Sequence, residues 1–204
     1  MQSSTTDPAT HPEAVLYKRC TVDLTCGTQL MTDLPCRNLE DVLGGFGRSF
    51  QDLAKRKITQ AYSDENPLIV NTGLLTGSTA MTGMRTYFSG YSPIKGSKKG
   101  LPAAMWSAGS GKFGAKFKWT GLDELTFEGR SAEPVYVVIR EAVNGPQVEL
   151  KSATHLLGLS THDKIMALQK NYPDAHIAVI GQAGENWEQY YMGAVALATE
   201  NQLK

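Results

Sequence analysis

The chain has 204 residues, and its 20 Lys and Arg balance 20 Asp and Glu, so the formal net charge is zero. This length predicts one domain, or one large domain with a small appendage. A neutral charge argues against nucleic-acid binding, which favours a basic excess. There is no apolar run of about 18 residues and no signal peptide at the N-terminus, so we expect a cytoplasmic protein with no membrane partner.

The first third of the chain predicts a tail, a hairpin and a helix. Residues 1–13 are rich in Ser, Thr and Pro and predict a flexible tail, which leaves residues 14–204 as a single domain. Alternation from Ala14 to Leu24, a turn at residues 26–28 and a returning strand over residues 29–34 predict a β-hairpin. Apolar spacing predicts a helix over residues 38–57.

Three glycines, Gly44, Gly45 and Gly47, interrupt that helix. Each costs about 1 kcal/mol in a helix interior. They therefore indicate a close packing partner, a bound ligand, or a helix that begins only after Gly47.

Short strands and turns dominate the remaining sequence, together with a second helix over residues 160–172 that Ser160 and Asp163 would cap. The predicted strands cover residues 68–71, 84–91, 103–107, 116–120, 124–128, 134–140, 147–150, 176–180 and 189–198. No β–α–β alternation is sustained, so we predict an α+β fold, mostly antiparallel, with roughly ten strands and two or three helices.

Several motifs carry little weight as catalytic or metal sites. Residues 109–114 match G-x-G-x-x-G, but a dinucleotide site requires a helix to follow, and the following residues alternate like a strand. Cys20, Cys26 and Cys36 lack the spacing of a zinc or iron–sulfur site, and an odd count predicts free thiols. We assign no catalytic residue and no metal ligand.

Two basic features could bind an anion. Lys95, Lys98 and Lys99 form a basic loop, which is more often simply solvated. Arg85 follows Gly83 at the end of a loop rich in Gly, Thr and Ser, where exposed N–H groups and a guanidinium suit phosphate or carboxylate. The alternative is an Arg that pins the loop by binding carbonyl groups.

An ordered set of segments resembles one family, the N-terminal domain of the tungsten- and molybdopterin-dependent aldehyde:ferredoxin oxidoreductases. Each segment is rich in glycine or in other turn-forming residues, and the segments follow one another in the same order as in the family. They are L-G-G-F-G at 43–47, N-P-L-I-V at 66–70, G-L-L-T-G at 73–77, G-M-R at 83–85, S-P-I-K-G at 92–96, K-F-G at 112–114, F-E-G at 127–129, E-P-V-Y at 133–136, A-T-H-L-L-G at 153–158 and G-Q-A-G-E-N at 181–186.

The resemblance implies a two-sheet, sandwich-like β domain that forms the base for a bis-pterin cofactor holding one tungsten or molybdenum. Its implied cofactor-binding residues share two glycine-rich loops. They are Gly83, Arg85, Ser107, Gly109, Ser110, Gly111 and Lys112. The resemblance puts an Arg of the first glycine segment at Phe46 and an Asn of the cofactor loop at Ala108, so a guanidinium and a side-chain amide of the family are missing here.

The resemblance leaves three functions open. The first is an accessory subunit of a larger oxidoreductase that acts on an aldehyde or oxo group and carries a [4Fe–4S] cluster; this chain, with no cluster of its own, would be inactive alone. The second is a split enzyme in which this chain supplies half of the pterin site. The third is a binding module that reuses the fold without redox work.

Overall fold

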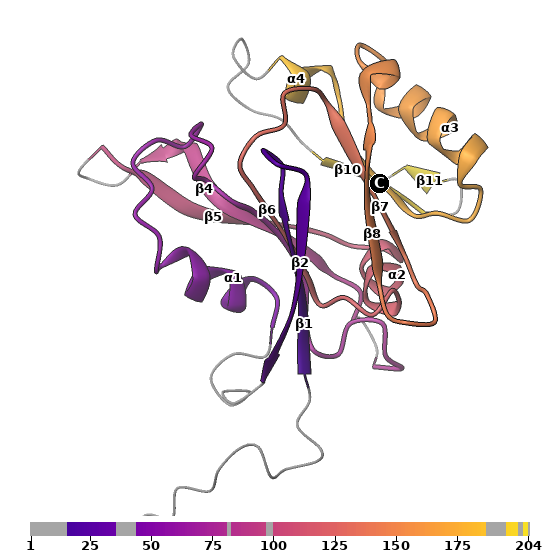
Figure 1. Ribbon diagram of the computed structural model, residues 1–204, viewed down its shortest axis with the longest axis horizontal. Helices are drawn as coiled ribbons and strands as arrows, with labels where there is room; N and C mark the ends of the chain where they lie inside the picture. Colours follow the sequence, from indigo (N-terminus) through magenta and orange to yellow (C-terminus); the bar gives the residue numbers. More distant parts are fainter. Residues whose placement is uncertain are drawn as a thin grey trace, which may run out of the picture.

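The computed structural model describes residues 16–35, 44–80, 83–96, 100–186, 195–199 and 202–203. Sixteen elements follow one another along these residues (Figure 1). In chain order they are β1 Leu16–Asp23, β2 Thr28–Pro35, α1 Phe46–Leu53, β3 Leu68–Thr72, β4 Thr86–Gly96, β5 Pro102–Gly109, α2 Phe113–Trp119, β6 Glu124–Glu128, β7 Val135–Arg140, β8 Gln147–Ser152, the 3-10 turn η2 Thr154–Leu156, α3 Thr161–Asn171, β9 Ile177–Ile180, α4 Gln182–Glu185, β10 Val195–Thr199 and β11 Gln202–Leu203.

A six-stranded sheet organises the domain, in the order β2-β1-β6-β3-β4-β5. Neighbouring strands are antiparallel except β1 and β6, which run parallel with Arg19 opposite Glu124. The hairpin β7–β8 and the three-stranded sheet β11-β10-β9 form the other two sheets. The predicted α+β, mostly antiparallel fold is confirmed.

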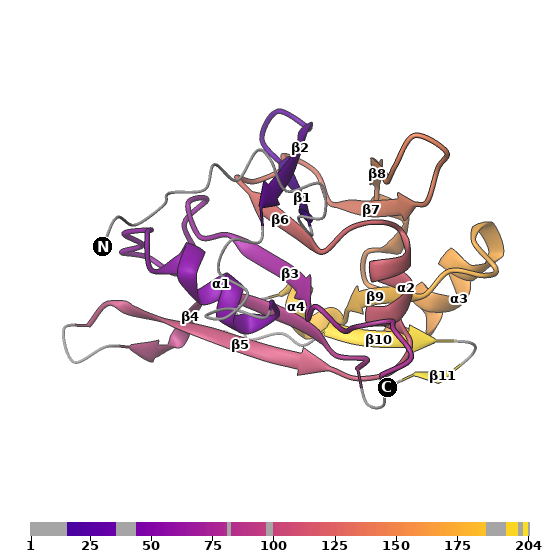
Figure 2. The same ribbon diagram turned by 90° about the horizontal axis from the view of Figure 1, so that it is seen from below.

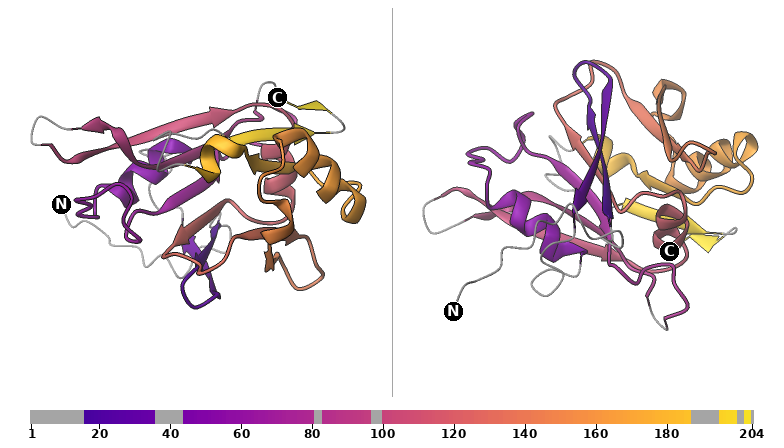
Figure 3. Two further views of the ribbon diagram at one scale, coloured as in Figure 1. Left: turned by 90° about the horizontal axis from the view of Figure 1, so that it is seen from above. Right: turned by 60° about the horizontal axis from the view of Figure 1, so that its bottom comes forward.

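The apolar core lies on one face of the large sheet. Val22, Val70 and Leu125 from three neighbouring strands pack with Phe117 of α2 and Val148 of β8. Alternating side chains of a strand point to opposite faces, so these strands place apolar residues on this face. A second core joins α3 to β9 and β10, and α3 lies at the end of the molecule opposite α1 (Figure 3).

Helix α1 covers the other face of the sheet and contacts β3 and β4 (Figure 2). The side chains between α1 and the sheet are unusually polar for an interior: Ser49 of α1 and Asn71, Ser89 and Glu124 of the sheet are all buried. The two faces of the sheet therefore differ in kind, one apolar and one holding a polar network.

Local sequence signals identified many of these elements. The hairpin β1–β2, strand β6 and helix α3 form as predicted, and Ser160 caps α3 by accepting a hydrogen bond from the Asp163 N–H. Helix α1 begins at Phe46 rather than residue 38, because Gly44 and Gly45 take positive φ values of 93° and 62° that a helix does not allow.

Two sequence predictions are wrong. Residues 116–119 belong to helix α2, not to a strand, and Phe113 and Phe117, four residues apart, turn one helical face toward the core. Strand β4 continues through Ser92 and Pro93 to Gly96, where a loop was expected. A bulge between Ser92 and Gly96 accommodates the proline in the β4–β5 ladder.

Several predictions concern residues outside the described part of the chain. They are the tail at 1–13, the start of the first predicted helix at 38–43, Cys36, the lysines at 98 and 99, and the start of the last predicted strand at 189–194.

Candidate functional site

Most of the residues implied as cofactor ligands converge at one corner of the six-stranded sheet. Thr86, the first residue of β4, pairs with Gly109, the last residue of β5. Gly83 and Arg85 lead into β4, while residues 110–112 lead out of β5 into α2. The two glycine-rich loops therefore lie side by side, as the resemblance requires.

Close backbone packing holds this corner together. A Cβ atom on Gly114 would stand 2.8 Å from the Met84 carbonyl oxygen and 2.8 Å from Thr86 Oγ1. A Cβ atom on Gly83 would stand 2.8 Å from the Leu75 carbonyl oxygen. Such distances are shorter than any side chain tolerates, so both glycines are needed where one protein segment crosses another.

The loop that carries Gly83 and Arg85 is fastened to α2. Trp119 at the end of α2 donates its indole N–H to the Gly77 carbonyl oxygen at 2.9 Å. The Gly77 N–H in turn donates to the Gly83 carbonyl oxygen at 3.0 Å. Arg85 therefore starts from an anchored backbone rather than from a free loop.

The corner presents positive charge to solvent. Arg85, Lys112 and Lys116 are all exposed. Among the described residues, Arg85 finds no hydrogen-bond or ion-pair partner, so the alternative in which it pins its own loop has no support there. A free guanidinium offers a planar, bidentate donor set for phosphate or carboxylate.

Ser107 stands apart from the other predicted residues. It pairs with Phe88, two positions along β5 from the Gly109–Thr86 pair, and is exposed. The structure therefore brings together Gly83, Arg85 and the 109–112 loop, and leaves Ser107 about 7 Å farther along the strand.

A second pair of family-like segments meets at the start of α1. Gly44 forms an isolated β-bridge with Gly73, and the Gly45 N–H donates to the Thr72 carbonyl oxygen at 3.0 Å. A Cβ atom on Gly45 would stand 2.9 Å from the ring of Tyr87. The close packing partner predicted for the glycine cluster is therefore the C-terminal end of strand β3 together with the ring of Tyr87.

An aromatic cluster surrounds Phe46, the position where the resemblance implies an Arg. Phe46 stacks on Trp106 with ring centroids 4.8 Å apart and an interplanar angle of 14°. Tyr87 approaches both rings, at 5.6 Å from Phe46 and 5.9 Å from Trp106. Phe46 and Trp106 remain 43% and 46% exposed, so this cluster shows stacked apolar rings to the surroundings.

A polar row runs across the sheet toward this aromatic cluster. Arg19, Glu124, Asn71 and Tyr87 are direct cross-strand neighbours on β1, β6, β3 and β4. The buried Glu124 carboxylate forms an ion pair with Arg19, with 2.5 Å between Arg19 Nε and Glu124 Oε1, and accepts a hydrogen bond from Asn71 Nδ2 at 3.2 Å. Tyr17 donates its hydroxyl to the same carboxylate at 3.0 Å.

The electrostatics of this row follow from burial. Burial and the Glu124 carboxylate raise the pKa of Tyr17 well above its usual value, because both disfavour the phenolate. Burial alone would lower the pKa of Arg19, but the carboxylates of Glu124 and Asp52 outweigh it and raise the pKa. The row is therefore an ion-paired support for α1.

Neither the aromatic cluster nor the polar row could be predicted from the sequence alone. Tyr87 and Trp106 alternate within their strands, but the register that joins them to Phe46 and Glu124 depends on strand order. Asn71 was expected only as the end of a short buried strand, although its Nδ2 also donates to Ser49 Oγ at 2.8 Å and to the Gly45 carbonyl oxygen.

Other titratable groups lie away from this region. Lys151 Nζ donates to the Tyr172 hydroxyl at 3.0 Å, and this bond with that of Tyr136 lowers the pKa of Tyr172. A cavity of about 440 Å³ lies beside the β1–β2 turn, but ion pairs such as Arg56–Glu128 occupy its wall.

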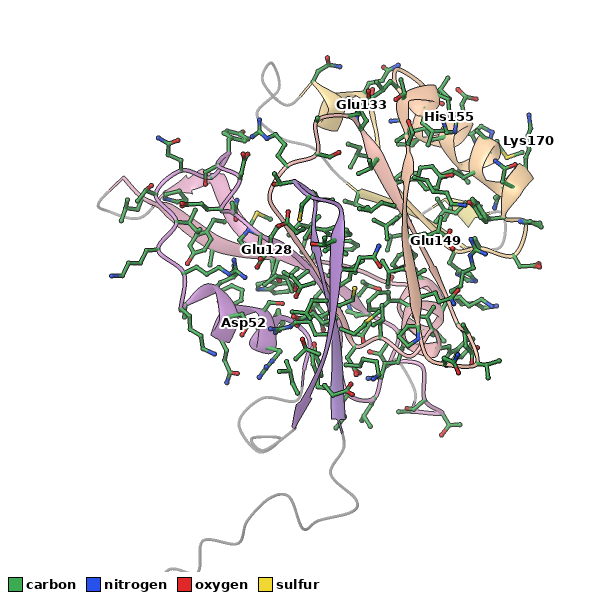
Figure 4. All side chains as sticks on the ribbon, viewed as in Figure 1. Asp52, Glu128, Glu133, Glu149, His155 and Lys170 are labelled. Carbon is green, nitrogen blue, oxygen red and sulfur yellow. The ribbon has the colours of Figure 1, made fainter. Side chains whose placement is uncertain are left out.

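The labelled acidic side chains lie on different elements of the molecule. Glu149 on β8 lies well apart from Asp52 on α1 and Glu128 on β6 (Figure 4). Among the described residues no three His, Cys, Asp or Glu side chains gather in a metal-binding arrangement. In the same residues no helix has the length and apolar character of a membrane span.

The fold and this corner define a class, namely a glycine-rich α+β base domain with an exposed cationic loop. Residues 19–198 match the family described as "Aldehyde ferredoxin oxidoreductase, N-terminal domain". The chain therefore belongs to the aldehyde ferredoxin oxidoreductase family, of which it represents the N-terminal domain.

Individual relatives agree with this assignment. A tungsten-containing aldehyde ferredoxin oxidoreductase of Pyrococcus abyssi is 37% identical over 144 residues, which is 70% of this chain and 22% of the relative. Its counterpart in Thermococcus kodakarensis is 39% identical over 124 residues, or 60% of this chain and 19% of the relative.

A solved structure confirms the fold. The structure of the active site complex BamBC of benzoyl coenzyme A reductase with 1,5-dienoyl-CoA contains a chain that superposes with a TM-score of 0.77 and 30% identity. The match covers 93% of this chain and 28% of that chain. This chain thus spans about a quarter or less of the length of the relatives it matches, so it resembles part of larger enzymes.

Proposed function

We propose that this chain is an accessory subunit of a tungsten- or molybdopterin-dependent oxidoreductase, in which it provides a base domain to a larger subunit that carries a [4Fe–4S] cluster. The substrate would bear an aldehyde or other oxo group. The chain would be inactive without its partner, and the pair would work in the cytoplasm.

One observation supports this proposal: the two glycine-rich loops meet, while two polar side chains that the resemblance implies are replaced by Phe46 and Ala108. The two glycine-rich loops meet at the Arg85 corner. At the start of α1, however, an apolar stack of Phe46 on Trp106 stands where the resemblance implies an Arg. Ala108, opposite Tyr87, has no amide to offer a ligand. A domain with such a site fits a supporting role beside a subunit that completes it.

The residues at the corner fit the anionic part of a pterin cofactor. In a split enzyme, the Arg85 guanidinium and the exposed Lys112 would bind phosphate groups, and the anchored 73–77 loop would keep the guanidinium oriented. When bound, the pterin-held metal would supply two-electron redox chemistry. Buried Thr86 Oγ1, which has no described hydrogen-bond partner, lies directly behind this corner.

The split-enzyme alternative rests on the same Arg85 corner, because one retained cation suffices to contribute to a shared site. Co-expression with a candidate large subunit separates the two functions. An accessory role predicts a stable complex whose metal and pterin content is unchanged by Arg85→Ala. A split enzyme predicts that Arg85→Ala lowers cofactor content, whereas Arg140→Ala, a distant exposed Arg paired with Glu149, does not.

The outcome that would contradict both functions is equally concrete. If purification from anaerobic cells recovers no pterin-dependent or iron–sulfur subunit with this chain, neither role holds. A ligand that stabilises the chain alone in a thermal-shift assay would then favour a binding module without redox work. At 100 times its dissociation constant, such a ligand should raise the free energy of unfolding by about 2.7 kcal/mol.

A further inference from the structure

A cluster of titratable side chains lies apart from the candidate site, where the hairpin β7–β8 meets the end of helix α3. Tyr136 on β7 and Lys151 on β8 are direct cross-strand neighbours. Tyr172 is the residue at which α3 ends, and Tyr136 packs against the core that α3 forms with β9 and β10. The ring of His155 in η2 stands edge-to-face against Tyr136, with ring centroids 6.3 Å apart. Side chains from four elements therefore gather at this point.

Two hydrogen bonds converge on the hydroxyl oxygen of Tyr172. Lys151 Nζ donates to this oxygen at 3.0 Å. Tyr136 forms the second bond, which raises the pKa of Tyr136, as expected for the donor of the pair. The same two bonds lower the pKa of Tyr172, because both stabilise its phenolate form. The Tyr172 oxygen is therefore an acceptor held between two donors, one of which is a cation.

The charges around this cluster also favour the phenolate of Tyr172. The bond to Tyr172 and the carboxylate of Glu149 raise the pKa of Lys151, so its ammonium group persists at neutral and mildly alkaline pH. In addition to Lys151, the positive charge of Arg140 lowers the pKa of Tyr172. Glu149 lies 2.8 Å from an Arg140 nitrogen and 3.5 Å from Lys151 Nζ, so two cations balance its negative charge.

Other tyrosines of the chain use their hydroxyl groups in the opposite sense. Tyr91 is half-buried like Tyr172, but it donates its hydroxyl to the Leu53 carbonyl oxygen at 2.8 Å. Tyr17 donates its hydroxyl to the buried Glu124 carboxylate at 3.0 Å. Such bonds require the proton and disfavour the phenolate, whereas the bonds to Tyr172 favour it. Tyr91 is therefore a natural comparison for the reactivity of Tyr172.

We infer that Tyr172 is an acylation site of this domain, where its phenol oxygen, held between Lys151 and Tyr136, attacks the carbonyl carbon of an activated acyl donor. A bond forms between Tyr172 Oη and the acyl carbon, and the bond from that carbon to the leaving group breaks. The phenol proton ends on the leaving group. Lys151 keeps its own proton, and its positive charge activates the oxygen as a neighbouring cation activates other protein nucleophiles. The inference goes beyond the proposed redox role and does not depend on it.

The test treats the purified full chain with N-acetylimidazole at pH 7.5 and follows each labelled peptide over time by mass spectrometry. Hydroxylamine removes an acetyl group from tyrosine oxygen but not from lysine nitrogen, so labels on Tyr172 and Lys151 are distinguished. Tyr172 should be acetylated about tenfold faster than Tyr91, because a hydrogen bond from a charged donor stabilises its phenolate. Its rate should also rise with pH earlier than that of Tyr91. Equal rates at the two residues would overturn the inference.

Variants of the two donors identify the cause of the reactivity. Lys151→Met should slow acetylation of Tyr172 about tenfold and move its pH profile to higher pH, whereas Lys151→Arg, which keeps the cation, should retain most of the rate. Lys170→Met is the matched control, because Lys170 is an exposed lysine in the last turn of α3. Tyr136→Phe, which removes the second donor, replaces Lys151→Met if the latter fails to fold. A rate at Tyr172 that neither donor variant lowers would overturn the inference, as would an equal loss with Lys170→Met.

Discussion

The buried ion pair beneath α1 supports a quantitative prediction. Arg19→Met keeps most of the aliphatic stem but removes the guanidinium that pairs with Glu124 and Asp52. The Glu124 side chain is 0% exposed and that of Asp52 is 14% exposed. The variant therefore leaves a fully buried carboxylate without its cation.

The expected cost is large relative to total stability. Removing one partner of a buried pair typically costs about 3–5 kcal/mol, because the remaining charge stays desolvated. Domains are stable by only about 5–15 kcal/mol, so Arg19→Met should remove a substantial fraction of the free energy of unfolding. The hydrogen bonds from Tyr17 and Asn71 to Glu124 remain and place the expected loss nearer 3 kcal/mol.

Urea denaturation followed by circular dichroism at pH 7 measures this loss as a lower midpoint with an unchanged slope. Arg130→Met is the matched control, because Arg130 pairs with Asp64 where the side chains are 59% and 60% exposed. Exposed pairs contribute about 0–1 kcal/mol. A loss from Arg19→Met no greater than that from Arg130→Met would refute the view that this pair is a buried support.

A double variant tests the cause. Adding Glu124→Gln to Arg19→Met replaces the unpaired carboxylate by a neutral amide that still accepts hydrogen bonds from Tyr17 and Asn71. The second substitution should restore about 1–3 kcal/mol, since contacting residues in one network are strongly non-additive. No recovery would mean that lost packing, not the stranded charge, destabilises the single variant.

Three further predictions concern single groups. Burial and Glu124 raise the pKa of Tyr17, so the Tyr17 hydroxyl stabilises the fold fully below about pH 10, and this contribution is lost as the pH rises above that value. Tyr17→Phe should therefore flatten the alkaline loss of stability in urea titrations. An unchanged profile would contradict this. Burial raises the pKa of the Cys20 thiol to about 11. Iodoacetamide at pH 7.5 should therefore label exposed Cys26 in the folded protein and Cys20 only after unfolding, which peptide mass spectrometry would show. Equal labelling of the two thiols would contradict the burial of Cys20. Gly114→Ala should lower the free energy of unfolding by about 1–2 kcal/mol, because its Cβ would stand 2.8 Å from a backbone oxygen. The control Gly96→Ala, whose Cβ would have its nearest contact at 3.7 Å, should change the free energy of unfolding by less than about 0.5 kcal/mol. Equal effects would exclude the close approach as the reason for the glycine at position 114.

The sequence predicted those elements whose signals are local. The Cys26–Gly27 turn, the alternation of β6 and the Ser160 cap of α3 each depend on residues a few positions apart. Helix α2 was misjudged because alternation in K-F-K-W resembles a strand over so short a segment. Its helical character depends on Phe113 and Phe117, four residues apart on one buried face, which five residues of alternation do not reveal.

The candidate site was also predicted only in part, because some of its contacts join strands that are distant in sequence. The order of segments in the family placed Gly83, Arg85 and the 109–112 loop at one site, and the Thr86–Gly109 pairing brings them together. The polar row from Arg19 to Tyr87 crosses strands that are distant in sequence. It depends on β6 inserting between β1 and β3, and hydrophobic periodicity contains no information on that strand order.

The replacement at Phe46 bears on how charge would be balanced in the split-enzyme alternative, where this chain supplies part of the pterin site. An aromatic ring stacked on Trp106 offers no cation to a phosphate, whereas an Arg in the same place would offer one. Arg85 and Lys112 at the other corner would then be the main positive groups that this chain directs toward an anionic cofactor. The remaining charge would have to come from the larger subunit, so exchanging Phe46 for Arg should strengthen cofactor retention only if the aromatic cluster faces the shared site. Unchanged pterin content in the Phe46→Arg complex would instead assign the exposed stack to protein contacts.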